Sequence, residues 1–194
     1  MNIILSNVSK SFGKKVVIQN FSSVIYQHQF NIIMGPSGCG KTTLLNILMG
    51  FLSPDRGTIT GVPENKSAVF QEDRLCESFS AVSNVRMVSS KDIDTKVIIE
   101  HFRSIGITKN SIHLPVSQLS GGMRRRVAIV RAILAKSDIL FLDEPFKGLD
   151  VEIKNVVIEY IKANTKSKTV VLVTHDVSCV NEFNGTLIKM DLLE

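Results

Sequence analysis

The chain has 194 residues, 44% of them hydrophobic and 21% charged, which is the composition of an ordinary soluble protein with one buried core. A net charge of +5 favours anionic partners such as nucleotides, nucleic acid or an acidic membrane surface, but does not choose among them. Three widely spaced cysteines argue against a disulfide framework or a zinc site and fit a reducing cytosol. No apolar run approaches the roughly 20 residues that span a bilayer, and the amino end lacks signal-peptide features, so we expect any membrane role to be peripheral.

The first part of the chain favours β-structure. Short alternating runs, "NIILSNVS" and "VVIQNFSSVIY", are typical of antiparallel strands. We therefore expect residues 1–30, together with residues 51–70, to form an antiparallel β-subdomain. The apolar run Phe30 to Met34 then predicts a buried strand, and the periodic segment Thr42 to Met49 predicts a helix.

A glycine-rich loop joins that strand to that helix. Its pattern, Gly35-x-x-x-x-Gly40-Lys41-Thr42, is that of a phosphate-binding P-loop (Walker A). Glycines let consecutive backbone N–H groups turn toward phosphate oxygens, and the helix N-terminus adds its positive dipole end. Lys41 would supply a mobile charge to the β- and γ-phosphates, and the Thr42 hydroxyl would bind Mg²⁺. We interpret Cys39, inside the loop, as a small space-filling residue and not as a redox switch.

The segment from about residue 72 to residue 118 predicts a compact helical subdomain. In "DIDTKVIIEHFRSIGI" the apolar residues Val97, Ile98 and Phe102 recur in a helical pattern. The segment is too short for a long coiled-coil arm, which separates this chain from P-loop proteins built on such arms.

The next stretch, "LSGGMRRRVAIVRA", predicts a helix that begins after Ser120, with Val127, Val130 and Leu134 on its buried side. Arginines 124 to 126 stand in its first turn, where cations oppose the helix dipole, so helix stability does not explain them. An acidic neighbourhood would be one compensation. As a nucleic-acid patch the run is weak, because it is short and has no interleaved aromatic residues.

Two later apolar runs end in polar residues that suit hydrolysis. The run Ile139 to Leu142 precedes Asp143 and Glu144, and "TVVLVT" precedes His175. Because ligands of an open parallel sheet bind at the carboxyl ends of its strands, we expect all three polar side chains beside the P-loop. Asp143 fits the organisation of a Mg²⁺ shell, and Glu144 could orient or deprotonate an attacking water. An acidic pair alone more often caps a helix, but the upstream P-loop reverses that preference.

Together these motifs resemble the nucleotide-binding subunit of an ATP-binding cassette (ABC) transporter over nearly the whole chain. Walker A is "GPSGCGKTT", the Q-loop is "AVFQED", the signature is "LSGGM", Walker B is "ILFLDE", the D-loop is "KGLD", and the switch histidine stands in "VTHD". The resemblance implies an α/β P-loop NTPase with a RecA-like mixed sheet flanked by helices. Residues 30–50 and 119–194 would form its nucleotide-binding core, with the β-subdomain before it and the helical subdomain inserted.

The resemblance also implies a role for each matching residue. Phe12 would stack on adenine with Val17 beside it, and Gln71 would report nucleotide state to a membrane partner. The loop that binds the phosphates would consist of Gly35, Pro36, Ser37, Gly38, Cys39, Gly40, Lys41, Thr42 and Thr43. Metal binding would fall to Thr42, Gln71 and Asp143, and catalysis to Lys41, Gln71, Glu144 and His175. Nucleotide held by a second subunit would be contacted by Leu119, Ser120, Gly121, Gly122, Met123 and Asp150.

The sequence departs from the family pattern at two of these positions. Met123 stands where the signature usually has Gln, and we expect tuned activity because the phosphate-contacting Ser and Gly remain. Phe12 stands where Tyr is commoner, which keeps the aromatic ring and loses only a hydroxyl.

The implied cofactors are ATP and Mg²⁺, and the implied partners are integral membrane permease subunits and a second ATPase subunit. An extracytoplasmic solute-binding protein would join them in an importer. Phe146 in "DEPFKGLD" favours import, because export, lipoprotein-release and cell-division cassettes more often carry Thr after the Pro. The chain would lie in the cytoplasm, on the inner face of the cell membrane. The alternatives are one of those other transport-type complexes, or a soluble ABC-type ATPase that acts on nucleic acid or ribosomes, although we expect no nucleic-acid partner.

Overall fold

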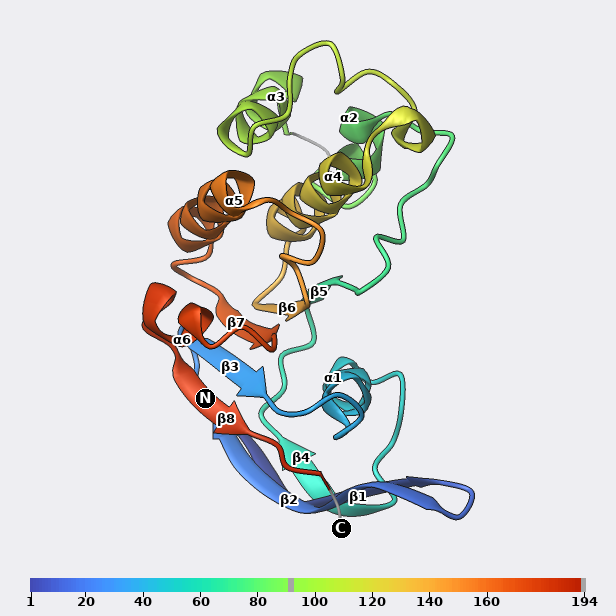
Figure 1. Ribbon diagram of the computed structural model, residues 1–194, viewed down its shortest axis with the longest axis vertical. Coiled ribbons are helices and arrows are strands. Elements are labelled where there is room, and N and C mark those ends of the chain that lie inside the picture. Colours follow the sequence, from blue (N-terminus) through green and yellow to red (C-terminus); the bar gives the residue numbers. More distant parts are fainter. Residues whose placement is uncertain (91–92, 193–194) are drawn as a thin grey trace.

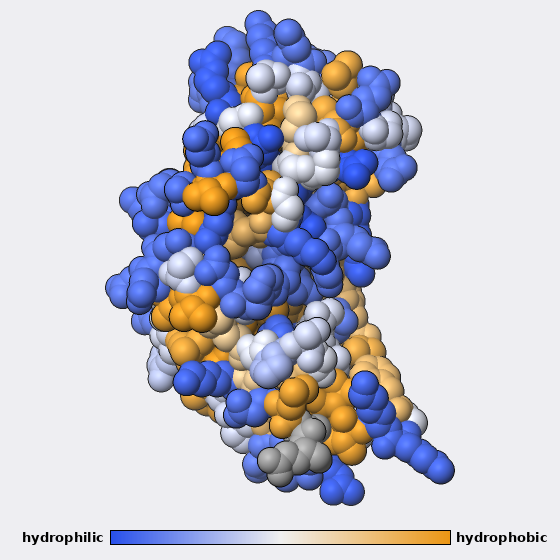
Figure 2. All heavy atoms as spheres, in the orientation of Figure 1, coloured by the Kyte–Doolittle hydropathy of each residue, from blue (hydrophilic) through white to orange (hydrophobic). Residues whose placement is uncertain are grey.

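The computed structural model describes residues 1–90 and 93–192, so residues 91–92 of the predicted helical segment and the last two of the predicted core lie outside the described residues. Figure 1 shows a sheet with helices in the middle of the molecule, a second sheet at one end and a group of helices at the other. Within the described residues, none of the helices is both long and apolar enough to cross a bilayer. On the face seen in Figure 2, apolar side chains form separate patches with polar ones between them.

The sheet at the end of the molecule is antiparallel, as expected, with the order β2-β1-β4. Its strands are β1 (Ile3–Phe12), β2 (Lys15–Ile25) and β4 (Arg56–Thr60). Ile3 and Leu5 of β1 alternate toward the core, but the next buried residue, Val8, follows after three positions. Between them Asn7 has a φ of 49° and the register shifts. This irregularity returns the later part of β1 to the buried face.

The central sheet has the strand order β5-β6-β7-β3-β8. Its strands are β3 (Phe30–Met34), β5 (Lys66–Val69), β6 (Ile139–Asp143), β7 (Thr169–Val173) and β8 (Thr186–Lys189). Two expectations are corrected here. Every described pairing in this sheet is parallel, whereas we expected a mixed sheet. Residues 66–69, which we assigned to the antiparallel subdomain, pair with β6 and bury Val69 in the core beside it, so tertiary pairing overrides the local pattern.

The helices are interspersed with the strands along the chain. They are α1 (Lys41–Met49), α2 (Ala81–Arg86), α3 (Thr95–Ser104), the 3₁₀ turn η1 (Val116–Gln118), α4 (Gly121–Leu134), α5 (Val151–Asn164) and α6 (Ser178–Glu182). Polar side chains cap the start of four of them: Ser80 caps α2, Asp94 caps α3, Ser120 caps α4 and Asp150 caps α5.

The two faces of the central sheet pack into two separate cores. Leu140 and Leu142 of β6 join the core formed with α4 and α5, whereas Phe141 joins the core formed with α1 and the antiparallel sheet. Strands buried on both faces need no polar alternation, which explains the continuous apolar runs in the sequence.

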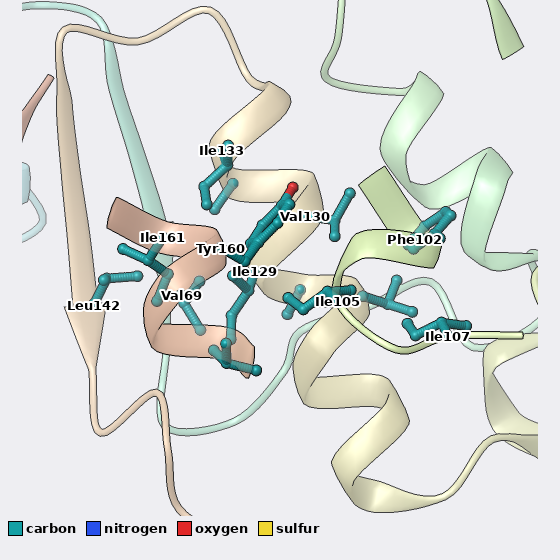
Figure 3. Close-up of a cluster of buried hydrophobic side chains, with 14 of the residues drawn as sticks. Val69, Phe102, Ile105, Ile107, Ile129, Val130, Ile133, Leu142, Tyr160 and Ile161 are labelled. Atoms are coloured by element: carbon teal, nitrogen blue, oxygen red, sulfur yellow. The ribbon is translucent and has the colours of Figure 1, made fainter. Parts of the chain in front are cut away.

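The helical end of the molecule shares the first of these cores. Ile98 and Phe102 of α3 are completely buried, and Figure 3 shows Phe102 and Ile105 in one cluster with Val130 of α4. Val97, which the helical pattern grouped with them, is 39% exposed. It lies about 100° around the helix from Ile98 and so leaves the buried face.

Candidate active site

The P-loop follows β3 and ends at the first residue of α1. Gly40 caps that helix in the left-handed region, with φ 100°, and a Cβ there would lie 2.9 Å from the carbonyl oxygen of Val17. Only glycine fits both the backbone conformation and this close approach. The Lys41 ammonium donates to the carbonyl oxygens of Gly35 and Pro36, each at 2.8 Å, so its charge is held over the loop.

Cys39 lies on the inner side of the same loop. Its side chain is buried in the core that contains α1, and its Sγ lies 3.9 Å from Lys41 Nζ. A Cβ at Gly35 would lie only 2.7 Å from that sulfur. The thiol therefore fills the space beneath the loop, which agrees with the space-filling interpretation of Cys39.

Thr42 and Asp143 bring α1 and β6 together at the floor of the site. The Thr42 hydroxyl donates to Asp143 Oδ2 at 3.2 Å. Asp143 is only 5% exposed. Burial raises the pKa of its carboxyl above the ordinary value and the charge of Glu144 adds to the rise, while the Thr42 hydrogen bond and the Lys41 charge oppose it. A hydroxyl and a carboxylate side by side are the hard oxygen donors that suit Mg²⁺.

Glu144 and His175 meet at the ends of two neighbouring parallel strands, β6 and β7. His175 Nδ1 lies 3.0 Å from Glu144 Oε1, and the His175 side chain is 78% exposed. Glu144 has a φ of 48°, and its backbone N–H donates to the Val173 carbonyl at 2.9 Å. A non-glycine residue in the left-handed region is uncommon, and here it follows directly after Asp143, the last residue of β6.

One cavity of about 780 Å³ brings most of the predicted residues together. Its lining comprises Phe12, Lys15, Val17, Gly35, Ser37, Gly38, Gly40, Lys41, Thr42, Thr43, Gln71, Asp143, Glu144, Lys147, Val173 and His175. Pro36 and Cys39 belong to the loop but do not line the cavity. Sequence reasoning missed Lys15 and Lys147, two cations that suit a polyanion. The sequence offered only a weak indication of these two lysines. Lys15 lies three residues after Phe12, and Lys147 lies three residues after Glu144.

The signature residues and the D-loop Asp150 do not line this cavity. Leu119 is buried, the Ser120 hydroxyl accepts from the Met123 backbone N–H at 3.3 Å, and Met123 packs partly buried on the core. Gly121 and Gly122 instead line a second cavity of about 700 Å³, which shares Thr42, Gln71, Asp143 and Lys147 with the first. Asp150 caps α5 through a 2.9 Å hydrogen bond from the Ile153 backbone N–H.

The arginines of α4 bind backbone carbonyls of the segments beside it. Arg125 is 7% exposed; its guanidinium donates to the carbonyls of Phe70 and Gln71, and its Nε lies 3.2 Å from Asp73 Oδ1. Arg126 donates to three carbonyls, and Arg131 donates to two. Arg125 and Arg126 therefore link α4 to neighbouring segments inside the protein. Among the hydrogen-bond and ion-pair partners described for them, Asp73 is acidic, as the sequence led us to expect, and the others are backbone carbonyls.

Comparison with known proteins agrees with this arrangement. A model of the ABC transporter family matches residues 18–147, more than half of the chain. The spermidine/putrescine import ATP-binding protein PotA of Fusobacterium nucleatum is 35% identical over 192 residues, which cover 90% of this chain and 51% of that protein. The aliphatic sulfonates import ATP-binding protein SsuB 3 of Rhodococcus jostii is 35% identical over 184 residues, which cover 90% of this chain and 66% of that protein. The chain thus spans about half the length of the first of these relatives and two thirds of the second.

Solved structures give the same result for the fold. The dimeric bacterial ABC transporter cassette MJ0796 superposes with a TM-score of 0.83 at 28% identity, covering 97% of this chain and 94% of that one. A post-hydrolysis dimer of the same cassette, bound to ADP and Pi, gives a TM-score of 0.83 at 26% identity. The fold expected from the motifs is confirmed, and the chain belongs to the ABC transporter family.

Proposed function

We propose that this chain binds ATP with Mg²⁺ and hydrolyses it to ADP and phosphate, as the nucleotide-binding subunit of a membrane transporter. The observation that carries the proposal is the Glu144–His175 pair, at 3.0 Å, in the same cavity as the P-loop lysine and the Thr42–Asp143 pair. A phosphate cradle, a cation site and a base beside a histidine are the parts that phosphoanhydride hydrolysis needs.

Nucleotide binding would use an aromatic surface and the P-loop of the same cavity. Phe12 is half exposed in its lining, which Val17 shares, and its ring offers a flat surface for adenine. The P-loop N–H groups and the α1 N-terminus would hold the phosphates. Lys41 would exchange its two carbonyl partners for phosphate oxygens, which suit its charge better.

Thr42 and Asp143 would hold Mg²⁺, with Gln71 contributing from the Q-loop side of the cavity. The cation would neutralise charge on the phosphates during hydrolysis. The raised pKa of Asp143 fits this role, because a buried carboxylate that lacks a full counter-charge gains most from a divalent cation.

Glu144 would orient and deprotonate the attacking water. Its bond to His175 Nδ1 fixes the direction of the carboxylate and leaves His175 Nε2 for the γ-phosphate or the water. Both groups line the same cavity as Lys41, which supports a site where water, phosphate and base would lie close together.

We propose further that two chains act together, head to tail. The signature residues lie outside the cavity that contains the P-loop, and Gly121, at the start of α4, has open space around it. A helix start with free N–H groups suits a phosphate, and a second chain would supply that phosphate. The D-loop Asp150 would face the same partner. If the two chains are identical, both sites would hydrolyse, since each would contain Glu144 and His175.

The remaining partners would be permease subunits in the membrane, which would hold the chain at the cytoplasmic face. The relatives quoted above are named as import proteins, which supports the lean toward import drawn from Phe146 and, with it, a solute-binding protein outside the membrane. The solutes in their names, a polyamine and sulfonates, differ in charge, although the two proteins are equally similar to this chain. The solute would therefore be chosen by the permease.

The test is the variant Glu144→Gln in purified protein with ATP and Mg²⁺. We expect it to bind ATP, to hydrolyse about 10²–10³-fold more slowly than wild type, and to sediment as a dimer. The matched control is Glu64→Gln, which changes the same type of side chain at an exposed position outside the cavity. A Glu144→Gln protein that hydrolyses ATP at the wild-type rate would contradict the assignment of the base, and one that stays monomeric would contradict the head-to-tail pair.

A further inference from the structure

Lys154 lies on the first turn of α5 and belongs to none of the sequence motifs. Its Nζ lies 2.6 Å from Asp176 Oδ2, 3.2 Å from Ser178 Oγ and 3.8 Å from Glu182 Oε1. The same ammonium lies 5.9 Å from the centroid of the Phe146 ring. Its side chain is only 18% exposed, so these contacts are partly shielded from water.

These partners belong to the two segments that carry the catalytic pair. Phe146 follows Glu144 by two residues, and Asp176 follows His175 directly. Both segments leave the sheet at its carboxyl edge, where His175 itself is largely exposed and has its one described hydrogen bond with Glu144. Lys154 is therefore a single cation that contacts the chain just beyond each member of the pair.

The charges explain what Lys154 does there. Its hydrogen bond to Asp176, followed by that from Ser178, lowers the pKa of the Asp176 carboxyl to about 2. Glu182 brings a second carboxylate, whose buried Oε2 has no hydrogen-bond partner among the described residues. Without the ammonium, Asp176 before α6 and Glu182 at its end would lose their shared counter-charge, and their mutual repulsion would act on the segment after His175.

We propose that Lys154 is a positioning residue for hydrolysis, which fixes His175 against Glu144 by tying the Phe146 and Asp176 segments to α5. The inference rests on the proposed ATPase function. Lys154 does not reach substrate in this arrangement; it acts through the segments that hold the pair. A displacement of the pair by a fraction of an ångström to about 1 Å is enough to slow a reaction strongly.

The experiment compares Lys154→Met, which keeps an unbranched side chain of similar length and removes its charge, with Lys162→Met on the same helix. Lys162 pairs with Glu159 on the surface, so its variant controls for loss of a charge from α5. For Lys154→Met we expect kcat for ATP to fall about 10-fold while the affinity for trinitrophenyl-ATP stays within about 2-fold. Lys154→Arg should restore most of kcat, because an arginine can still bridge the carboxylates.

A second readout does not depend on turnover. The protein has four histidines, and in histidine-labelled samples the ring resonances of His175 should shift in Lys154→Met, whereas those of the exposed His113 should not. Wild-type kcat in Lys154→Met, or an unmoved His175 signal, would overturn the inference and leave the ATPase proposal intact. Equal losses of kcat in the Met and Arg variants would also overturn it. If wild type itself does not hydrolyse ATP, the function falls, and the resonance shift alone then decides whether Lys154 positions His175.

Discussion

The nucleotide cavity and the helical end of the molecule are positioned in different ways. In the cavity, each functional residue is positioned by the helix or strand next to it in the sequence. Gly40 forms the turn into α1, and Asp143 and His175 lie at or just after the ends of β6 and β7. The helical end is instead held by long-range contacts: it shares a core with α4 and α5, and side chains of α4 reach distant carbonyls, such as Arg125 to Phe70 and Arg126 to Ile105. The residues of the cavity can therefore be recognised from short sequence motifs. The attachment of the helical end depends on contacts between residues that are far apart in the sequence.

The largest expected effect falls on the cavity. Lys41→Ala removes the ammonium that is held over the P-loop and should weaken ATP binding by about 100-fold or more, while the fold is retained. Equilibrium titration with ATP measures the loss, and thermal unfolding checks the fold. Lys147→Ala, which removes a second cation from the cavity lining, should cost far less. Unchanged binding in Lys41→Ala would count against the P-loop assignment.

The next effect falls on the attachment of the helical end. Arg125→Met leaves the carbonyls of Phe70 and Gln71 without their partner and should lower the free energy of unfolding by about 2–3 kcal/mol. Arg124→Met, in the same turn but less buried, should change it by no more than about 0.5 kcal/mol. Urea unfolding of both variants measures the difference. Equal small losses in the free energy of unfolding would show that the hydrogen bonds of Arg125 do not stabilise the attachment.

The smallest effect is a gain in stability at the floor of the cavity. Because folding raises the pKa of Asp143 above its unfolded value of about 3.9, the folded state binds the proton more readily, and stability falls as pH rises through that range. At neutral pH the ionised carboxylate therefore costs folding free energy. Asp143→Asn should stabilise the nucleotide-free protein by about 0.5–1 kcal/mol and abolish Mg²⁺-dependent hydrolysis. If Asp143→Asn lowered the free energy of unfolding at pH 7 and left it unchanged at pH 3, the predicted stabilisation would be contradicted.

The sequence allowed the cavity to be predicted because its residues sit at fixed offsets from strands and helix starts. The P-loop, Asp143, Glu144 and His175 all follow apolar runs, so their neighbourhood could be inferred before any contact was known. The edge strand β5 could not be assigned, since four residues with mixed polarity carry no sign of which sheet they join. The carbonyl contacts of the arginines and the contacts of Lys154 could not be predicted either. Their partners are backbone carbonyls or distant carboxylates, which leave no pattern in the sequence near the cation.

The central claim is that each working site combines the P-loop of one chain with the signature of another. Mixing two inactive variants, Glu144→Gln and Gly121→Asp, tests it directly. A Cβ at Gly121 meets no atom within 4 Å, so aspartate fits at the helix start and repels phosphate there. An equal mixture should recover about a quarter of the wild-type ATPase rate, because half of the dimers are mixed and each of these has one intact site of two. A mixture as inactive as its two components would contradict the claim and place the whole site within one chain.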